Sequence, residues 1–323
     1  MTSLRLMGPE LEGAPFHGMI GCHPRMHRLF SDIEHAAPLP SPVLIEGATG
    51  TGKELVARAL HQLSGVAGSL IAVNVAELAE PLAEAELFGA VRGAYTGAMS
   101  DRRGLLETAA GGTLFLDEAG DLSPPLQAKL LRVLETGRVR QLGAATDRQV
   151  RFRLVVSVQR QAADLLAEGK WRADFYYRVA GISLQLPSLA ERQTDIKALA
   201  DHFLRELGCP PLANGEGDLL LGYGWPGNVR ELRRVLERAV HCARGGPIGV
   251  EDIRRALAAG SRTDQARPAP SSALSLREVE REHISSILRQ VNGDARAAAA
   301  LLGLSRSSLY RRLELLGIQP RAR

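Results

Sequence analysis

The sequence predicts an α/β protein with a mostly parallel sheet, followed by a helical subdomain and a separate all-α module. Three observations support this fold class. Short apolar runs alternate with longer helix-like stretches in the first part of the 323-residue chain, these runs stop after Pro187, and residues 259–273 are rich in Pro, Ser and Gly. Short buried strands that alternate with helices are typical of a parallel sheet, and a stretch without large apolar residues is typical of a linker.

Four apolar runs are the expected strands: PVLIEG, SLIAVNV, GTLFLDE and FRLVVSV. Helices are expected between them at ELVARALHQLS and LQAKLLRVLE, and after them at DIKALADHFLREL, NVRELRRVLERAVHCA and EDIRRALAA. The domain limits that follow are a short N-terminal segment (1–17), an α/β subdomain (18–187), a helical subdomain (188–258), a linker (259–274) and a C-terminal module (275–323).

Composition and charge narrow the class of protein. Hydrophobic residues make up 45% and charged residues 24% of the chain, which is close to the average of globular proteins. The three cysteines form no CxxC pair, so a disulfide framework or zinc site has no support. No apolar run is long enough to cross a membrane and the N-terminus does not resemble a signal peptide, so we expect a cytoplasmic protein.

The net charge of +4 is concentrated at the C-terminus. Residues 275–323 contain nine arginines and five acids, a difference of four that equals the formal charge of the whole chain. A basic module of this kind is typical of proteins that bind an anionic partner such as nucleic acid.

A phosphate-binding loop is expected directly after the first strand. The run GATGTGK matches GxxxxGK, in which glycine allows backbone N–H groups to point at phosphates and the lysine reaches the outer ones. A simple glycine-rich turn before a helix is the alternative. Position 54 is an acid where most such loops have a Ser or Thr that binds Mg²⁺. The expected nucleotide-binding residues are Gly47, Thr49, Gly50, Thr51, Gly52, Lys53 and Glu54.

Two acids follow the third expected strand. Asp117 and Glu118 would lie at the carboxyl edge of the sheet, near the nucleotide. We expect Asp117 to hold Mg²⁺ through water, and Glu118 to orient and deprotonate the attacking water. Adjacent acids after a strand also occur as solvated turns, but 64 residues after the lysine of a phosphate-binding loop they indicate an ATPase.

Five motifs in order extend this interpretation: GATGTGKE, ELFGAVRGAYTGA, GGTLFLDE, WRADFYYR and GWPGNVREL. Together they resemble the AAA+ domain of the bacterial enhancer-binding proteins, ATPases that activate sigma-54 RNA polymerase, over residues 19–258. The resemblance implies an AAA+ P-loop NTPase fold with a helical lid, and ATP and Mg²⁺ as cofactors.

The resemblance also implies roles for single residues. Asn74 would be the switch that couples the γ-phosphate to Glu118, and Arg230 would be the sensor arginine of the lid. Arg172 and Arg178 resemble the arginine fingers that complete a neighbouring subunit's site. A homo-oligomer, from a dimer up to a hexameric ring, is therefore implied.

Some positions depart from the family's pattern. Ala48 stands where the family usually has Glu, and Val158 and Gln159 stand where a Thr-Asn pair is expected. Ala180 replaces an Asn and Ala190 replaces an Arg. Because Val158 lacks a hydroxyl and Gln159 is one methylene longer than Asn, hydrolysis or its coupling is expected to differ from that of the family.

The hexapeptide GAYTGA corresponds to the family's GAFTGA loop. By resemblance, Tyr95, Thr96 and Gly97 contact sigma-54 and nearby promoter DNA at the tip of an insertion in a core helix. Small residues let the backbone change shape at little cost, and one aromatic ring offers a large contact area. A tight glycine turn with a packed tyrosine is the alternative.

The C-terminal module predicts three helices, the last two joined at Gly303 and Leu304, with Ser305 capping the third. It resembles the Fis-type helix-turn-helix, whose last helix would enter a major groove. A helical dimerisation tail with a basic face is the alternative, and dimerisation through the first helix is expected in any case. The expected DNA-contacting residues are Arg306, Ser307, Ser308, Tyr310, Arg311 and Arg312.

These observations predict a sigma-54-dependent activator that binds enhancer DNA and spends ATP on opening promoters with sigma-54 RNA polymerase. A DNA-binding regulator that no longer remodels sigma-54, and an AAA+ machine with another substrate, are the alternatives. The first 17 residues are too few for a sensory domain, so we expect either a regulatory protein in trans or a longer natural chain.

Overall fold

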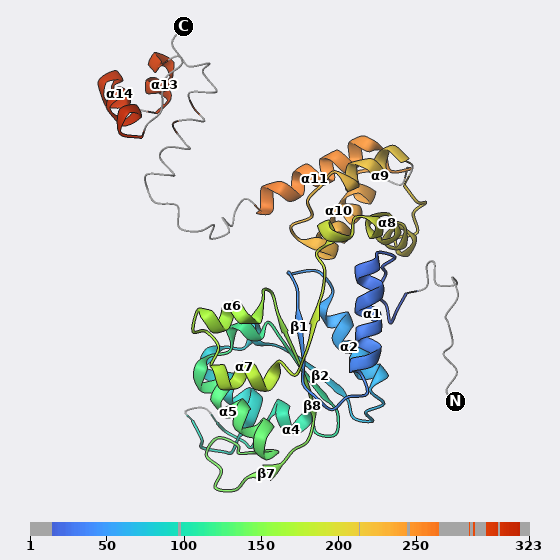
Figure 1. Ribbon diagram of the computed structural model, residues 1–323, viewed down its shortest axis with the longest axis vertical. Coiled ribbons are helices and arrows are strands. Elements are labelled where there is room, and N and C mark those ends of the chain that lie inside the picture. Colours follow the sequence, from blue (N-terminus) through green and yellow to red (C-terminus); the bar gives the residue numbers. More distant parts are fainter. Residues whose placement is uncertain are drawn as a thin grey trace. The chain divides into compact units, whose positions relative to one another are not determined.

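The computed structural model describes residues 15–95, 98–212, 214–243, 246–264, 284, 287, 295–302 and 304–316 (Figure 1). The chain divides into two compact units, residues 1–260 and 261–323. None of the helices in the described parts is long and apolar enough to cross a membrane.

The larger unit is built on a five-stranded parallel sheet, as the sequence predicts. Its strands are β1 (Val43–Glu46), β2 (Leu70–Asn74), β5 (Thr113–Asp117), β8 (Arg153–Val158) and β9 (Ile182–Gln185), in the order β2-β5-β8-β1-β9. The first four are the predicted strands. The fifth was missed because its sequence, ISLQ, alternates at a sheet edge and forms no apolar run.

Helices cover both faces of this sheet (Figure 1). One face packs against α1 (Pro24–Ala36) and α2 (Lys53–Leu63) through a cluster that includes Ile33, Leu60 and Phe115. The other packs against α5 (Pro124–Thr136), α6 (Ala162–Ala167) and α7 (Ala173–Val179) through a cluster that includes Leu114 and Leu116. Neighbours along β5 thus point to opposite faces, as strand geometry requires.

The remaining short elements of this part connect the sheet and its helices. They are η1 (Val75–Glu77), α3 (Glu80–Phe88), β3 (Gly89–Ala90), β4 (Arg102–Arg103), α4 (Leu105–Thr108), η2 (Ala119–Asp121), β6 (Arg138–Val139) and β7 (Arg148–Gln149).

A helical subdomain follows β9 and η3 (Leu189–Arg192). It consists of α8 (Thr194–Glu206), α9 (Asn214–Leu221), α10 (Asn228–Cys242) and α11 (Val250–Asp264). These helices enclose their own core, which includes the fully buried Trp225 and Leu236. Three of the helices were predicted, and α9 is additional.

The C-terminal unit contains α13 (Ala295–Leu301) and α14 (Arg306–Leu315), which pack through Ala298, Leu309 and Leu313. The backbone N–H of Ser308 donates to the Ser305 hydroxyl at 3.1 Å, so the predicted cap of the last helix is confirmed. Most of the predicted first helix, residues 275–291, lies outside the described residues.

Candidate functional site

The loop between β1 and α2 has the geometry of a phosphate-binding loop. Gly50 and Gly52 have φ angles of +77° and +109°, a region that residues with a side chain rarely adopt. Gly52 is the N-cap of α2, so the positive end of this helix dipole faces the loop. The Gly47 N–H donates to the carbonyl of Val158 at 3.2 Å, which ties the start of the loop to the middle of the sheet.

Lys53 is the first residue of α2 and is only 8% exposed. Its Nζ donates to the carbonyl oxygens of Gly47 at 2.8 Å and Ala48 at 3.3 Å. Burial lowers the pKa of Lys53, the negative charges of Asp117 and Glu118 raise it, and the positive charge of Arg230 lowers it. Lys53 therefore lies close to Asp117 and Glu118, at the carboxyl edge of the sheet, and to Arg230 of α10.

The two acids end the central strand β5. Asp117 pairs in register with Asn74 of β2, and its Oδ1 accepts a hydrogen bond from the hydroxyl of Ser157 on β8. No described residue donates to the second oxygen of Asp117, so it can accept from a metal-bound water. One carboxylate together with substrate phosphates is a common way of holding Mg²⁺.

Glu118 has a φ of +56°, and its backbone N–H donates to the Ser157 hydroxyl at 3.3 Å. Its carboxylate accepts a hydrogen bond of 2.7 Å from the side-chain amide of Gln159. In the sequence Gln159 stands out only as a departure from the family's pattern, and Ser157 was not predicted as a site residue.

Two other predicted site residues point elsewhere in this conformation. The side chain of Asn74 is engaged in its own turn, where it accepts from the Ala76 N–H at 3.1 Å and donates to Glu77 at 2.8 Å. Glu54 is exposed and pairs with Arg58 one turn further along α2, at 2.7 Å.

The helical subdomain contacts the backbone of the phosphate-binding loop directly. The Asn228 side chain donates to the carbonyl of Thr49 at 3.0 Å, and Arg192 donates to that of Thr51 at 3.1 Å. The backbone N–H of Arg230 donates to the carbonyl of Gly50 at 3.3 Å. Asn228 and Arg192 were missed. Both are buried, and neither their burial nor their contacts with the loop can be read from the local sequence.

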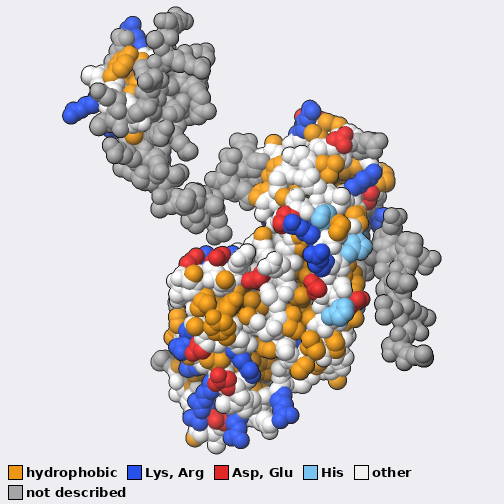
Figure 2. Space-filling view, in the orientation of Figure 1, with side chains coloured by type: hydrophobic (Ala, Val, Ile, Leu, Met, Phe, Trp, Pro, Cys, Tyr) orange, Lys and Arg blue, Asp and Glu red, His pale blue; other side chains and the backbone are white. Residues whose placement is uncertain are grey.

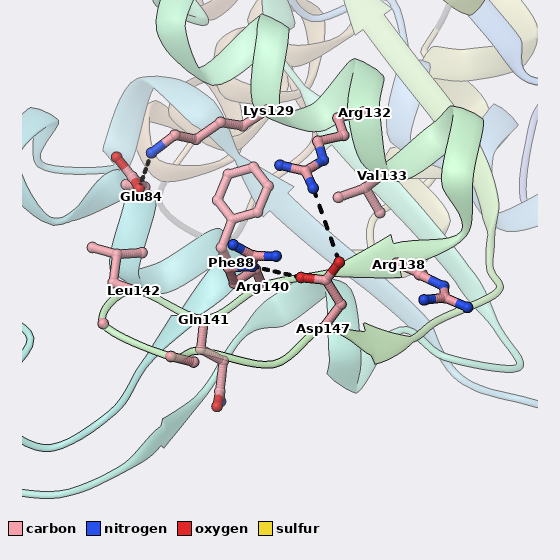
Figure 3. A pocket seen from close by; sticks show the side chains of 12 residues that line it. Glu84, Phe88, Lys129, Arg132, Val133, Arg138, Arg140, Gln141, Leu142 and Asp147 are labelled. Atoms are coloured by element: carbon pink, nitrogen blue, oxygen red, sulfur yellow. Dashed lines mark hydrogen bonds and ion pairs between the residues drawn. The ribbon is translucent and has the colours of Figure 1, made fainter.

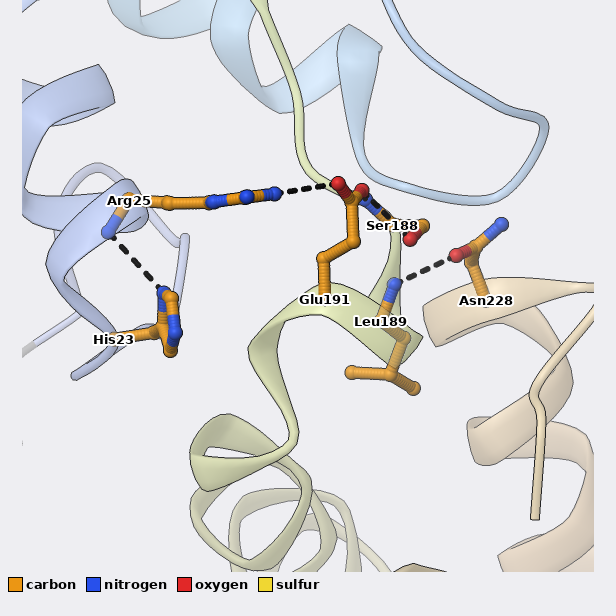
Figure 4. A network of polar contacts seen from close by, with 6 residues as sticks. All are labelled: His23, Arg25, Ser188, Leu189, Glu191 and Asn228. Atoms are coloured by element: carbon orange, nitrogen blue, oxygen red, sulfur yellow. Dashed lines mark hydrogen bonds and ion pairs between the residues drawn. The ribbon is translucent and has the colours of Figure 1, made fainter.

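A second network ties the helical subdomain to α1 (Figure 4). Arg25 of α1 pairs with Glu191 of η3 at 2.5 Å, and both the N–H and the hydroxyl of Ser188 donate to Glu191 at 2.8 Å. Figure 4 also shows the Leu189 N–H donating to Asn228, at 2.8 Å. The segment that joins the two subdomains, residues 188–191, thus also holds Asn228, whose side chain reaches the phosphate-binding loop.

The two candidate arginine fingers lie on and beside α7. Arg172, which precedes the helix, pairs with Asp174 at 2.7 Å, and Arg178 donates to the carbonyl of Leu134 at 2.7 Å. Neither hydrogen-bonds to a described residue of its own phosphate-binding loop. Hydrophobic side chains gather over α6 and α7 on the face that Figure 2 shows, and Tyr177 of α7 is 74% exposed.

The GAYTGA segment lies between α3 and α4 in the chain and connects the antiparallel pair β3 and β4. It is closed by hydrogen bonds from the N–H of Gly93 to the carbonyl of Ala98 at 2.9 Å, and from the N–H of Ala98 to that of Tyr95 at 3.0 Å. Tyr95 is half-buried, and Thr96 and Gly97 lie outside the described residues.

The loop between β6 and β7 supports the base of this insertion. The Leu142 N–H donates to the carbonyl of Gly89 at 2.9 Å, and the Val91 N–H donates to that of Leu142 at 3.0 Å. Behind it lies a pocket of about 310 Å³ in which Arg132 and Arg140 point at Asp147, and Lys129 points at Glu84 (Figure 3). The pocket shares no lining residue with the phosphate-binding loop.

In the C-terminal unit, α14 has one buried face and one exposed face. Leu309 and Leu313 face the core. The exposed side chains are Ser307, Ser308, Tyr310, Arg311 and Arg312, and the side chain of Arg306 lies outside the described residues.

Comparison with known families matches all three parts of the chain. Residues 19–185 match the Sigma-54 interaction domain, residues 190–270 the AAA+ ATPase lid domain, and residues 275–316 the bacterial regulatory proteins of the Fis family.

Individual proteins show the same similarity. The transcriptional regulatory protein ZraR of Salmonella typhimurium is 41% identical over 315 residues, which cover 94% of this chain and 70% of ZraR. The response regulator protein PilR of Pseudomonas aeruginosa is 38% identical over 330 residues, which cover 98% of this chain and 74% of PilR.

Solved structures agree with the fold. NtrX from Brucella abortus in complex with ATP is 31% identical, with a TM-score of 0.67 over 93% of this chain and 69% of NtrX. The RuvB Holliday junction branch migration motor of Thermotoga maritima, 17% identical, has a TM-score of 0.52 over 94% of this chain and 90% of RuvB, a likeness of fold alone. The chain therefore belongs to the sigma-54-dependent transcriptional regulators, with an AAA+ ATPase domain, its lid and a Fis-type helix-turn-helix.

Proposed function

We propose that this protein is a sigma-54-dependent transcriptional activator that hydrolyses ATP in an oligomeric ring and uses the energy to convert the closed promoter complex into the open one. The observation that carries the proposal is the meeting of Lys53, Asp117 and Glu118 at one edge of the sheet, under a lid that touches the phosphate-binding loop. This arrangement can bind a triphosphate and activate a water beside it.

Each residue of the site has a proposed role. The N–H groups of residues 47–53, including those of Thr49 and Thr51, and the ammonium group of Lys53 bind the phosphates. Asp117 holds Mg²⁺ through water, and the ion neutralises charge on the phosphates. Glu118 orients and deprotonates the attacking water. Arg230 senses the nucleotide from the lid, and Asn74 couples the γ-phosphate to Glu118. Glu54 lies at the rim of the site, paired with Arg58.

The lid contacts support a coupling between the nucleotide and the lid. Asn228 and Arg192 hold carbonyl oxygens of the same loop whose N–H groups would bind phosphates. A change in the loop when nucleotide binds or leaves therefore acts directly on α10 and η3, and through them on the whole helical subdomain.

The outward position of α7 supports a site completed by a second subunit. Arg172 and Arg178 are exposed, and a guanidinium that enters a neighbour's site stabilises charge on the transferring phosphoryl group. We propose that Arg172 and Arg178 act in trans, within a ring formed by residues 18–258.

Two further surfaces contact macromolecules in this proposal. Tyr95, Thr96 and Gly97 grip sigma-54 and nearby promoter DNA, and the ring of Tyr95 provides apolar contact area. Residues 275–323 bind enhancer DNA. The linker that the sequence predicts before them, at residues 259–274, is shorter at its start, because α11 extends to Asp264. In this module Arg306, Ser308 and Tyr310 would contact bases, and Arg311 and Arg312 would contact phosphates, with Ser307 beside them.

Transcription in vitro from a sigma-54 promoter tests the proposal. We expect transcripts with ATP and none with a non-hydrolysable analogue. Lys53→Ala should fail because it no longer binds the nucleotide, and Glu118→Gln should fail although it still binds. Lys197→Ala, an exposed lysine of α8, is the matched control and should transcribe normally. Transcription without ATP would overturn the proposal, and sigma-54-independent repression at the same DNA site would favour a regulator without remodelling activity.

A further inference from the structure

The strand beside the two acids, β8, ends at Val158, and the polar side chains that contact the acids are those of Ser157 inside the strand and Gln159 directly after it. Side chains alternate along a strand, so Ser157 and Val158 point to opposite faces of the sheet. Val158 is 1% exposed and belongs to the apolar cluster that includes Leu116. Position 158 therefore serves the core, and the polar contacts with the acids come from its two neighbours.

Ser157 connects the two acids. Its hydroxyl donates to Asp117 and accepts from the backbone N–H of Glu118, and the side chain is fully buried. A hydroxyl that donates to one group and accepts from the next fixes the direction of both. Because Asp117 ends β5 and Ser157 lies on the adjacent β8, the contact also holds the end of the strand against its neighbour.

Gln159 holds the carboxylate of Glu118 at 2.7 Å. An amide donor is neutral, so it fixes the position of the carboxylate without forming an ion pair that would neutralise it. Glu118 needs such support because its backbone is in the left-handed region, which residues other than glycine adopt only when their surroundings impose it.

Asn74 makes other contacts in this conformation, although the family resemblance assigns it control of Glu118. Both polar atoms of the Asn74 side chain are engaged within residues 74–77. Among the described residues, Gln159 is the side chain that hydrogen-bonds to the Glu118 carboxylate.

We propose that Ser157 and Gln159 are the positioning residues of the acid pair. Gln159 aims the Glu118 carboxylate at the attacking water, and Ser157 fixes Asp117 and the backbone of Glu118. The two residues together replace the Thr-Asn pair that the resemblance leads one to expect at positions 158 and 159. This inference rests on the proposed function, because it assumes that Glu118 is the general base.

The substitution Gln159→Leu in the full chain tests the positioning role of Gln159, because leucine has a similar size and cannot donate a hydrogen bond to Glu118. The loss of one hydrogen bond to a charged group changes a rate or equilibrium constant by about tenfold. We therefore expect kcat for ATP hydrolysis to fall about tenfold, with the KM for ATP, the nucleotide affinity and the melting temperature unchanged. Gln161→Leu is the matched control: Gln161 is exposed two residues later, and its side chain has no hydrogen bond to the described residues, so kcat should stay unchanged.

An unchanged kcat in Gln159→Leu would overturn the inference, and so would a fall that follows a loss of nucleotide affinity, since that would indicate a binding role. Glu118→Gln separates this failure from that of the proposed function. If Glu118→Gln abolishes hydrolysis while Gln159→Leu hydrolyses normally, only the positioning role fails. If Glu118→Gln hydrolyses at the normal rate, the proposed function fails as well.

Combining two substitutions tests whether Gln159 acts through Glu118. The shorter carboxylate of Glu118→Asp cannot reach the amide, so adding Gln159→Leu to Glu118→Asp should change kcat less than twofold. A second tenfold fall in the double variant would show that Gln159 acts independently of Glu118, and would contradict the inference.

Discussion

At the scale of single residues, the contact between lid and loop depends on the absence of a side chain at Gly50. A Cβ at this position would lie 2.4 Å from the carbonyl oxygen of Gly227, which precedes α10. The glycine is therefore needed twice, once for its positive φ and once because the lid backbone approaches it so closely.

Comparing Gly50→Ala with Gly65→Ala separates these two effects. Gly65 also has a positive φ, +68°, but no atom lies within 4 Å of its Cβ position. We expect both variants to lose about 1 kcal/mol in the free energy of unfolding because of backbone strain. Only Gly50→Ala should also lose nucleotide affinity, by more than about tenfold, because its lid is displaced. Calorimetric titration with ATP measures this, and equal affinities in the two variants would contradict the lid contact.

Some residues of the candidate site could be predicted from the sequence and others could not. Lys53, Asp117 and Glu118 were predicted because each belongs to a local motif with a known chemical use. Asn228 and Ser157 were missed because their roles come from contacts with residues 179 and 40 positions away. No local pattern indicates that an asparagine at the start of a helix will reach a carbonyl of another subdomain.

At the scale of elements, the short helix η3 is the joint between the two subdomains of the larger unit. Glu191 of η3 accepts from Ser188 and pairs with Arg25 of α1. The hydrogen bonds from the Ser188 hydroxyl and N–H, with the charge of Arg25, hold the pKa of Glu191 below its usual value of 4.5. The charged form of Glu191 therefore stabilises the folded state.

Glu191→Gln should remove this pH-dependent contribution. Because the pKa is lower in the folded than in the unfolded chain, the stabilisation is present above pH 4.5 and is lost as the pH falls through the depressed value. Because the side chains of Arg25 and Glu191 are about half exposed, we expect their interaction to contribute less than about 1 kcal/mol to the free energy of unfolding. Melting temperatures of wild type and variant should differ at pH 7 and converge as the pH falls through the depressed pKa of Glu191.

Glu34→Gln, an exposed acid of α1 without an ion pair among the described residues, serves as the control and should melt like the wild type at each pH. A difference between wild type and Glu191→Gln that stays constant from pH 7 to the acid limit would refute the role of the charge.

Elements were predicted better than contacts. Four strands and the helices α2, α5, α8, α10 and α11 follow from apolar runs and helical periodicity, which depend on burial alone. The helices α1, α6 and α7, which also cover the sheet, were not predicted. The edge strand β9 and the helix α9 were missed, because ISLQ has two polar residues in four and NGEGDLLL contains two glycines and no amphipathic spacing. Their structure comes from neighbouring elements and not from local preference.

At the scale of the whole molecule, a single chain is incomplete as an ATPase in this proposal. Lys53 and Glu118 belong to one subunit's site, whereas Arg178 donates to the carbonyl of Leu134 and to no described residue of that subunit's phosphate-binding loop. Arg178→Ala and Lys53→Ala should each be inactive alone. In a mixture, an intact site forms wherever the Lys53 of one variant meets the Arg178 of the other, so ATPase activity should return in part.

A mixture of Lys53→Ala with Glu118→Gln is the control for this complementation. Both substitutions lie in the half-site that each subunit supplies to itself, so every site in the mixed ring has a defect and no activity should return. Recovery in the control mixture, or none in the first mixture, would contradict an arginine supplied in trans.

The most direct test of the central claim, that ATP hydrolysis opens promoters through the GAYTGA loop, is the number of open complexes formed per ATP hydrolysed by Thr96→Ala. We expect normal ATP hydrolysis and normal binding to enhancer DNA, with few or no open complexes. Tyr95→Phe, which keeps the aromatic ring, should open promoters like the wild type. Full promoter opening by Thr96→Ala would contradict the role of the loop.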